Sequence, residues 1–111
     1  MVTKLTYSKG SSYRFADGET AKQIATAGLE VGGLSLKNAG GGGAALFIYD
    51  ASTAGNANPS NLAWVLDTGA TGQDNQTFPH PQFFKHGMYI VLEQGEGTKA
   101  VFCLNRISSE V

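Results

Sequence analysis

Apolar and polar residues alternate along short stretches of this chain, which is the pattern of half-buried β-strands. In residues 29–37, Leu34 and Leu36 share one face. Ser35 and Lys37 share the opposite face. No stretch of ten or more residues keeps an apolar stripe at helical spacing without a glycine interrupting it. The pattern therefore predicts an all-β fold.

Turn residues close each of the strands that this pattern predicts. Asn38 and the four glycines after Ala39 predict a flexible hairpin connection. Gly95-Glu96-Gly97 predicts a tight hairpin turn between the last two strands, and Pro79-His80-Pro81 predicts an extended path. The further strands are expected at residues 44–50, 62–67, 75–78, 87–94 and 98–107. Their number and spacing are typical of a single antiparallel β-sandwich or jelly-roll-like barrel of about 6–8 strands.

Residues 44–50 are apolar on both faces. Leu46 and Ile48 lie on one side of the expected strand, and Phe47 and Tyr49 lie on the other. A strand that is covered on both faces is either central in its sheet or packed against a partner subunit.

The first 22 residues differ from the rest because four basic and two acidic residues give them a net charge of +2. Aromatic residues interleave with this charge. We expect residues 1–22 to form an N-terminal arm or edge segment, and residues 23–111 to form the β-sandwich domain. An arm would lie on an acidic neighbour, whereas an edge segment would be a slightly basic strand of the same domain. The candidate partner-binding residues are Lys4, Tyr7, Lys9, Tyr13, Arg14 and Phe15.

Composition and charge exclude several classes of partner. The formal net charge is -1 and only 15% of the 111 residues are charged, so no strong field attracts nucleic acid or an anionic membrane. A single cysteine cannot form an internal disulfide framework. The start of the chain lacks the apolar stretch of a signal peptide, and no apolar run is long enough to span a bilayer. We expect synthesis in a cytoplasm.

Residues 65–70 carry a motif of possible catalytic meaning. Two apolar residues before Asp67-Thr68-Gly69-Ala70 are similar to the active-site loop of retroviral-type aspartic proteases, where two aspartates share a proton across a dimer. In that family the loop lies early in the protomer, but Asp67 lies past the midpoint of this chain. Asp-Thr-Gly is also ordinary turn chemistry after a strand. A turn is the preferred interpretation.

Other residue types that could carry chemistry are scattered. His80 and His86 are the only histidines, and Cys103 is far from both in sequence, so they do not form a zinc motif. Cys103 is expected on the apolar face of a strand, where a free thiol is usually inert. We therefore expect no metal, no cofactor and no catalytic residues.

Strand aromatics offer an alternative function. A stacking platform on one sheet would suit a carbohydrate-binding β-sandwich, although aromatics at alternate strand positions are more often core or interface. The residues expected to form this platform are Tyr49, Trp64, Tyr89 and Phe102.

The order of strands and loops resembles a known class of proteins. The segments that carry the resemblance are residues 46–50, 63–66, 77–79, 86–91 and 101–102. Together they are similar to small β-sandwich virion structural proteins of tailed bacteriophages, of the head decoration or cement type. The resemblance covers about residues 30–107 and leaves the first 22 residues outside.

This resemblance implies a non-enzymatic protein that binds the capsid surface in many copies and stabilises the shell. The partners it implies are the major capsid protein or another virion protein, together with further copies in a homo-oligomer such as a trimer. It implies a location in the virion after synthesis in the host cytoplasm. The low charge, the small polar loops and the strand that is apolar on both faces agree with a protein that shares surfaces with its neighbours.

Overall fold

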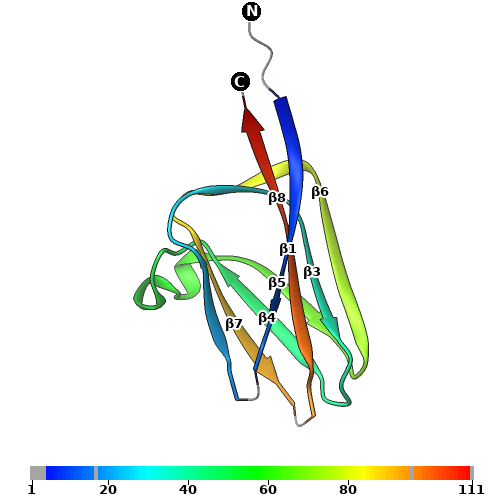
Figure 1. The fold of residues 1–111 in the computed structure, drawn as a ribbon. Helices are drawn as coiled ribbons and strands as arrows, with labels where there is room; N and C mark the ends of the chain where they lie inside the picture. The colour runs from blue at the N-terminus through cyan, green and yellow to red at the C-terminus, as the bar shows by residue number, and fades with distance from the viewer. Residues whose placement is uncertain (1–4, 17, 96, 111) are drawn as a thin grey trace, which may run out of the picture.

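The computed structural model describes residues 5–16, 18–95 and 97–110, and it is an eight-stranded β-sandwich (Figure 1). Sheet A has the strand order β1-β8-β3-β6, and sheet B has the order β2-β7-β4-β5. All pairs are antiparallel. The strands are β1 (Leu5–Arg14), β2 (Ala21–Ala25), β3 (Leu29–Asn38), β4 (Ala44–Tyr49), β5 (Leu62–Thr68), β6 (Gly72–Phe84), β7 (Met88–Gln94) and β8 (Ala100–Glu110).

Six of the seven connections cross from one sheet to the other. Only β4 and β5 are neighbours both in sequence and in a sheet, and two short 3-10 turns, Ala54–Asn56 and Pro59–Asn61, lie between them. Two sheets of four strands with this order form a jelly roll. The expected fold class is confirmed. No helix in the part of the chain that the structure describes has the length and apolarity to cross a membrane.

Two predicted hairpins are wrong. The turn after Gln94 carries the chain from β7 in sheet B to β8 in sheet A, and the glycine-rich segment after Asn38 carries it from β3 to β4 in the same way. Because the strand period is two residues in either case, apolar alternation does not reveal whether the next strand pairs with its predecessor or faces it across the core.

The core lies between the sheets and follows the predicted alternation. Leu34, Leu36, Leu46 and Ile48 are at most 2% exposed. Leu46 and Ile48 line the core from sheet B, together with Met88, Ile90 and Leu92 of β7 and Leu66 of β5. Leu34 and Leu36 line it from sheet A, together with Phe102 and Leu104 of β8. The inward residues of β3, β4 and β7 therefore follow the alternation of the sequence.

The edge strands depart from prediction. β6 runs for 13 residues, through Pro79 and Pro81, where only a short strand at 75–78 was expected. Its register with β3 shifts between the partners of Val31 and Gly33, so the proline segment bulges from the ladder. β1 falls in the segment that was expected to be an arm or edge, whereas β2 begins in that segment and continues past residue 22. The division at residue 22 stays a prediction.

One buried amide joins the turns at one end of the sandwich. Asn38 is 1% exposed, and its Nδ2 donates to the carbonyl oxygens of Gly42 and Gly69. Its Oδ1 accepts from the N–H groups of Gly40 at 3.0 Å and Lys99 at 3.2 Å. These four partners lie in three different turns, so this side chain fixes the positions of the turns relative to one another.

Candidate assembly surface

Two rows of apolar residues cross the outer face of sheet B. Phe47 on the inner strand β4 lies between Val91 on β7 and Val65 on β5. Two residues further along, Tyr49 lies between Tyr89 and Leu62. These two cross-strand rows are all outward-facing because the alternate residues of β4 and β7 enter the core. The apolar face consists of Phe47, Tyr49, Leu62, Val65, Tyr89 and Val91.

Exposure is greatest on the edge strand of this face. Val65 is 42% exposed and Leu62 is 40% exposed, and both are large apolar residues. Strict alternation along β5 would place Leu62 on the inward face with Trp64. A register shift between Ile48 and Tyr49 turns it outward instead. Contiguous apolar area on a sheet's solvent side is typical of a contact surface for another protein.

Acidic side chains border the apolar face at one end. Asp67 and Glu93 lie on either side of Ala45, one row beyond Phe47, and both are exposed. The backbone N–H of Asp67 donates to Asp74 Oδ2 at 3.0 Å, and the Thr68 hydroxyl lies 3.5 Å from the carbonyl oxygen of Ala44. The Asp-Thr-Gly segment therefore ends β5 and begins a turn.

The outer face of sheet A has a different chemistry. Ser12, Cys103, Ser35 and Asn75 form one row across its four strands, and the Ser35 hydroxyl donates to Asn75 Oδ1 at 2.6 Å. The next row contains Gly10, Asn105, Gly33 and Thr77. These small residues form the floor of a shallow hollow of about 330 Å³.

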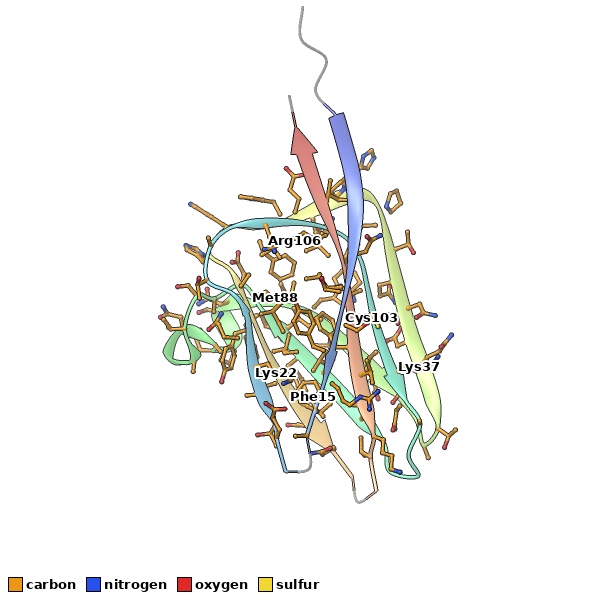
Figure 2. All side chains as sticks on the ribbon, in the orientation of Figure 1. Phe15, Lys22, Lys37, Met88, Cys103 and Arg106 are labelled. Atoms are coloured by element: carbon orange, nitrogen blue, oxygen red, sulfur yellow. The ribbon has the colours of Figure 1, made fainter. Side chains whose placement is uncertain are left out.

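Cys103 was expected on the apolar face of its strand, and this prediction is wrong. Its neighbours Phe102 and Leu104 enter the core, so Cys103 lies on the outer face of sheet A, half-buried beside Ser12 (Figure 2). The alternation of β8 is correct, but both of its faces carry residues that sequence alone reads as apolar. The face that carries Cys103 was taken as the apolar face, whereas the face that carries Phe102 and Leu104 enters the core.

The proposed aromatic platform is also wrong. Phe102 is fully buried, and Trp64 packs against the core, edge-on to Phe78 with the ring centroids 5.1 Å apart. Tyr49 and Tyr89 alone share an outer face, and they sit opposite each other in the ladder.

The structure describes the side chains of only some of the predicted partner-binding residues, and those do not all lie on one surface. Lys4 lies outside the described residues, and Tyr7 and Lys9 belong to β1. Tyr13 packs against the core and stacks on Phe102 with the centroids 6.2 Å apart. The Phe15 ring is 9% exposed, and Figure 2 shows it between the sheets.

Arg14 is exposed and lines an open cleft of about 690 Å³ at one end of the sandwich. The β1–β2 and β7–β8 turns form most of this cleft, with Lys99 as a second basic residue in its wall. On β2, the Lys22 ammonium lies 5.6 Å from the centroid of the Phe15 ring and 2.9 Å from Glu19 Oε1.

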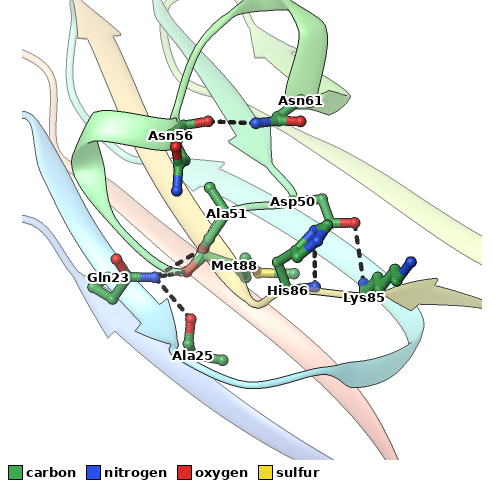
Figure 3. A network of polar contacts seen from close by, with 9 residues as sticks. All are labelled: Gln23, Ala25, Asp50, Ala51, Asn56, Asn61, Lys85, His86 and Met88. Carbon is green, nitrogen blue, oxygen red and sulfur yellow. Dashed lines mark hydrogen bonds and ion pairs between the residues drawn. The ribbon is translucent and has the colours of Figure 1, made fainter.

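Side chains hold the loops in place by hydrogen bonds at the opposite end of the sandwich (Figure 3). Gln23 Nε2 lies within 3.0 Å of three carbonyl oxygens, those of Ala25, Ala51 and Met88. The Asp50 carboxylate accepts the backbone N–H groups of Lys85 and His86. This network fixes the β6–β7 turn against the β4–β5 loop and so holds the rim of the apolar face.

His86 belongs to this network rather than to a metal site. Its Nδ1 lies 3.6 Å from Asp50 Oδ1. His80 is in the bulged segment of β6, and Cys103 is on the outer face of the other sheet. Among residues 5–16, 18–95 and 97–110, no group of three or more metal-ligating side chains comes together.

No family model matches the chain, and no curated protein matches its sequence. The crystal structure of PirA is 10% identical with a TM-score of 0.46, and the match covers 95% of this chain and 94% of that one. The extra small virus particle of the giant freshwater prawn Macrobrachium rosenbergii is 8% identical with a TM-score of 0.47, over 96% and 80% of the two chains. The structure of infectious bursal disease virus Gx strain is 12% identical with a TM-score of 0.30, over 96% of this chain and 35% of that one. Two of the three are virus structures, and TM-scores below 0.5 carry no functional inference for this chain.

Proposed function

We propose that this chain is a non-enzymatic virion structural protein of the decoration or cement type, which binds neighbouring shell subunits through the apolar face of sheet B. The observation that carries the proposal is the pair of apolar rows across β7, β4 and β5, with Val65 and Leu62 about two-fifths exposed at their edge. A partner that covers these rows removes apolar area from water, which is the main favourable term in protein association.

The rest of the surface suits the same function. Only 15% of the residues are charged, which lowers the desolvation cost of contacts with several neighbours. One small apolar face gives a weak contact by itself. In a shell, many copies act together, and their combined avidity retains the protein on the particle.

The function is tested by asking where the chain resides after virions are released. We expect it to co-sediment with DNA-filled particles in a density gradient, detected by an antibody or by its tryptic peptides. We also expect particles that lack it to lose their DNA at a lower temperature, because a cement protein stabilises the shell. Recovery of the chain only among the soluble proteins at the top of the gradient contradicts the proposal.

One observation favours a second candidate, a carbohydrate-binding surface. Tyr49 and Tyr89 face each other on the outer side of sheet B, and Gln23 lies opposite Tyr89 on β2. Two tyrosine rings beside an amide form a site of the kind that stacks on a sugar. Glycan binding that is lost in Tyr89→Ala but kept in Val65→Ala supports this candidate. A glycan array without any bound sugar removes it.

A further inference from the structure

Three of the four edge strands carry a feature that blocks pairing with another chain. β6 has two prolines and a bulge. β5 lies next to β6 where the edges of the two sheets meet, and Trp64 contacts Phe78 across this junction. β2 is five residues long and is interrupted by a bulge after Gln23. Short length, prolines, bulges and covering elements are the means by which proteins protect sheet edges.

β1 has none of these features. It is ten residues long, contains no proline, and keeps a continuous register with β8 from Leu5↔Glu110 to Arg14↔Val101. β3 pairs with β8 only as far as Ile107, so the ends of β1 and β8 continue past sheet A as a two-stranded ribbon (Figure 1). A two-stranded ribbon is marginally stable in water by itself, so further pairing on its free edge stabilises it.

We propose that β1 pairs antiparallel with β1 of a second copy around a two-fold axis at Gly10, which joins two copies of sheet A into one eight-stranded sheet. The inference rests on the proposed function in that it names the contact through which copies of the chain associate. Pairing of residues 6–14 with their symmetry mates forms about ten main-chain hydrogen bonds, which is the number that a typical protein interface contains.

The sequence of β1 is compatible with pairing against itself in this register. Lys9 lies opposite Ser11 of the second copy and Arg14 lies opposite Thr6, so no two like charges face each other. Gly10 is exposed, and a Cβ built on it meets no atom within 4 Å. At the axis, the strand therefore has no side chain of its own and no close neighbour on that face of the sheet.

A cysteine placed at Gly10 tests the pairing directly. We expect Gly10→Cys, in a Cys103→Ser background, to form disulfide-linked dimers on mild oxidation, since the Cα atoms of directly opposite residues lie roughly 4.5–5.5 Å apart, within the range that a disulfide spans. The background substitution is needed because Cys103 is near β1, with Sγ 3.6 Å from Ser12 Oγ. Lys37→Cys in the same background is the control, because Lys37 is exposed on the inner strand β3. Cross-linking of Gly10→Cys no faster than the control overturns the proposal.

Charge at the same position gives a second, reversible test. Gly10→Lys places two lysines opposite each other and is expected to sediment as a monomer, while an equimolar mixture with Gly10→Glu regains dimers. Thermal unfolding followed by circular dichroism verifies that both variants fold. If either fails to fold, hydrogen exchange of the unaltered protein replaces them, and protection of the β1 amides must rise with concentration. A dimer that persists in Gly10→Lys contradicts β1 pairing, and binding of the chain to particles then still supports the proposed function separately.

Discussion

At the residue scale, side chains that bind main-chain groups hold the turns of the sandwich in place. Asn38 joins three turns at one end, and Gln23 and Asp50 join two loops at the other. Sequence reasoning assigned Asn38 only to a glycine-rich connection. The turns that Asn38 joins come together only because the chain crosses from one sheet to the other. No local sequence pattern therefore reveals the role of Asn38.

Replacement of Asn38 is expected to destabilise the whole domain. Asn38→Ala removes four hydrogen bonds and leaves buried main-chain groups without a partner, which lowers the free energy of unfolding by about 3 kcal/mol. Urea denaturation measures the change. Asn75→Ala is the control because Asn75 is exposed and has one bond to Ser35, and it is expected to cost about 1 kcal/mol or less. Equal losses in the two variants contradict the role of Asn38.

Glu19 gives a prediction for pH. The backbone N–H of Ala16 donates to its carboxylate at 3.0 Å, and this bond, followed by the contact with Lys22, lowers the Glu19 pKa from its ordinary value of 4.5. A carboxyl whose pKa is lower in the folded state stabilises the fold above its unfolded pKa, and this contribution is lost as the pH falls through the folded pKa.

NMR titration of the Glu19 side chain measures that shift. We expect Lys22→Ala to raise the Glu19 pKa only part of the way to 4.5, because the larger cause is the Ala16 N–H. A return to the full ordinary value in Lys22→Ala shows instead that the ion pair is the main cause.

At the scale of the strands, alternation predicted the six later strands and the inward residues of β3, β4 and β7, but not which face of β8 enters the core or how the strands pair. β7 and β8 have the same pattern whether they form a hairpin or face each other across the core. The two arrangements differ in how the turns pack against each other. The β3–β4 turn lies against the β7–β8 turn, and a Cβ on Gly40 would be 1.9 Å from the carbonyl oxygen of Gly97. β1 was expected only as one of two alternatives, an arm or an edge strand, because small polar residues occupy its middle.

The β6–β7 turn depends on a glycine. Gly87 has a φ of +147°, and a Cβ there would lie 2.4 Å from the carbonyl oxygen of Ala25. Gly87→Ala is therefore expected to lower the free energy of unfolding by about 2 kcal/mol. Gly55→Ala is the matched control, since its Cβ meets only Thr53 Oγ1 at 3.9 Å, and a change within about 0.5 kcal/mol is expected. A Gly87→Ala protein as stable as the control contradicts this account of the turn.

At the scale of the whole molecule, the candidate surface was predictable only in part. The sequence shows that Phe47 and Tyr49 leave the core on the side opposite Leu46 and Ile48. It does not show that Val65 and Val91 lie beside Phe47, because those neighbours follow from the register of three strands. β1, in the basic and aromatic segment that was expected to be an arm or an edge segment, is an edge strand of sheet A, with Tyr13 and Phe15 turned toward the core.

The most direct test of the apolar face is the number of copies that a particle binds. Particles stripped of the chain are mixed with the unaltered protein, with Val65→Lys or with Thr77→Lys, and bound copies are counted after sedimentation. Thr77 is the control because it is exposed on an edge strand of the opposite sheet. We expect Thr77→Lys to bind as the unaltered protein does and Val65→Lys to lose at least about tenfold in affinity, the effect of 1.4 kcal/mol. Unchanged binding of a folded Val65→Lys protein would show that the apolar face is not the assembly surface.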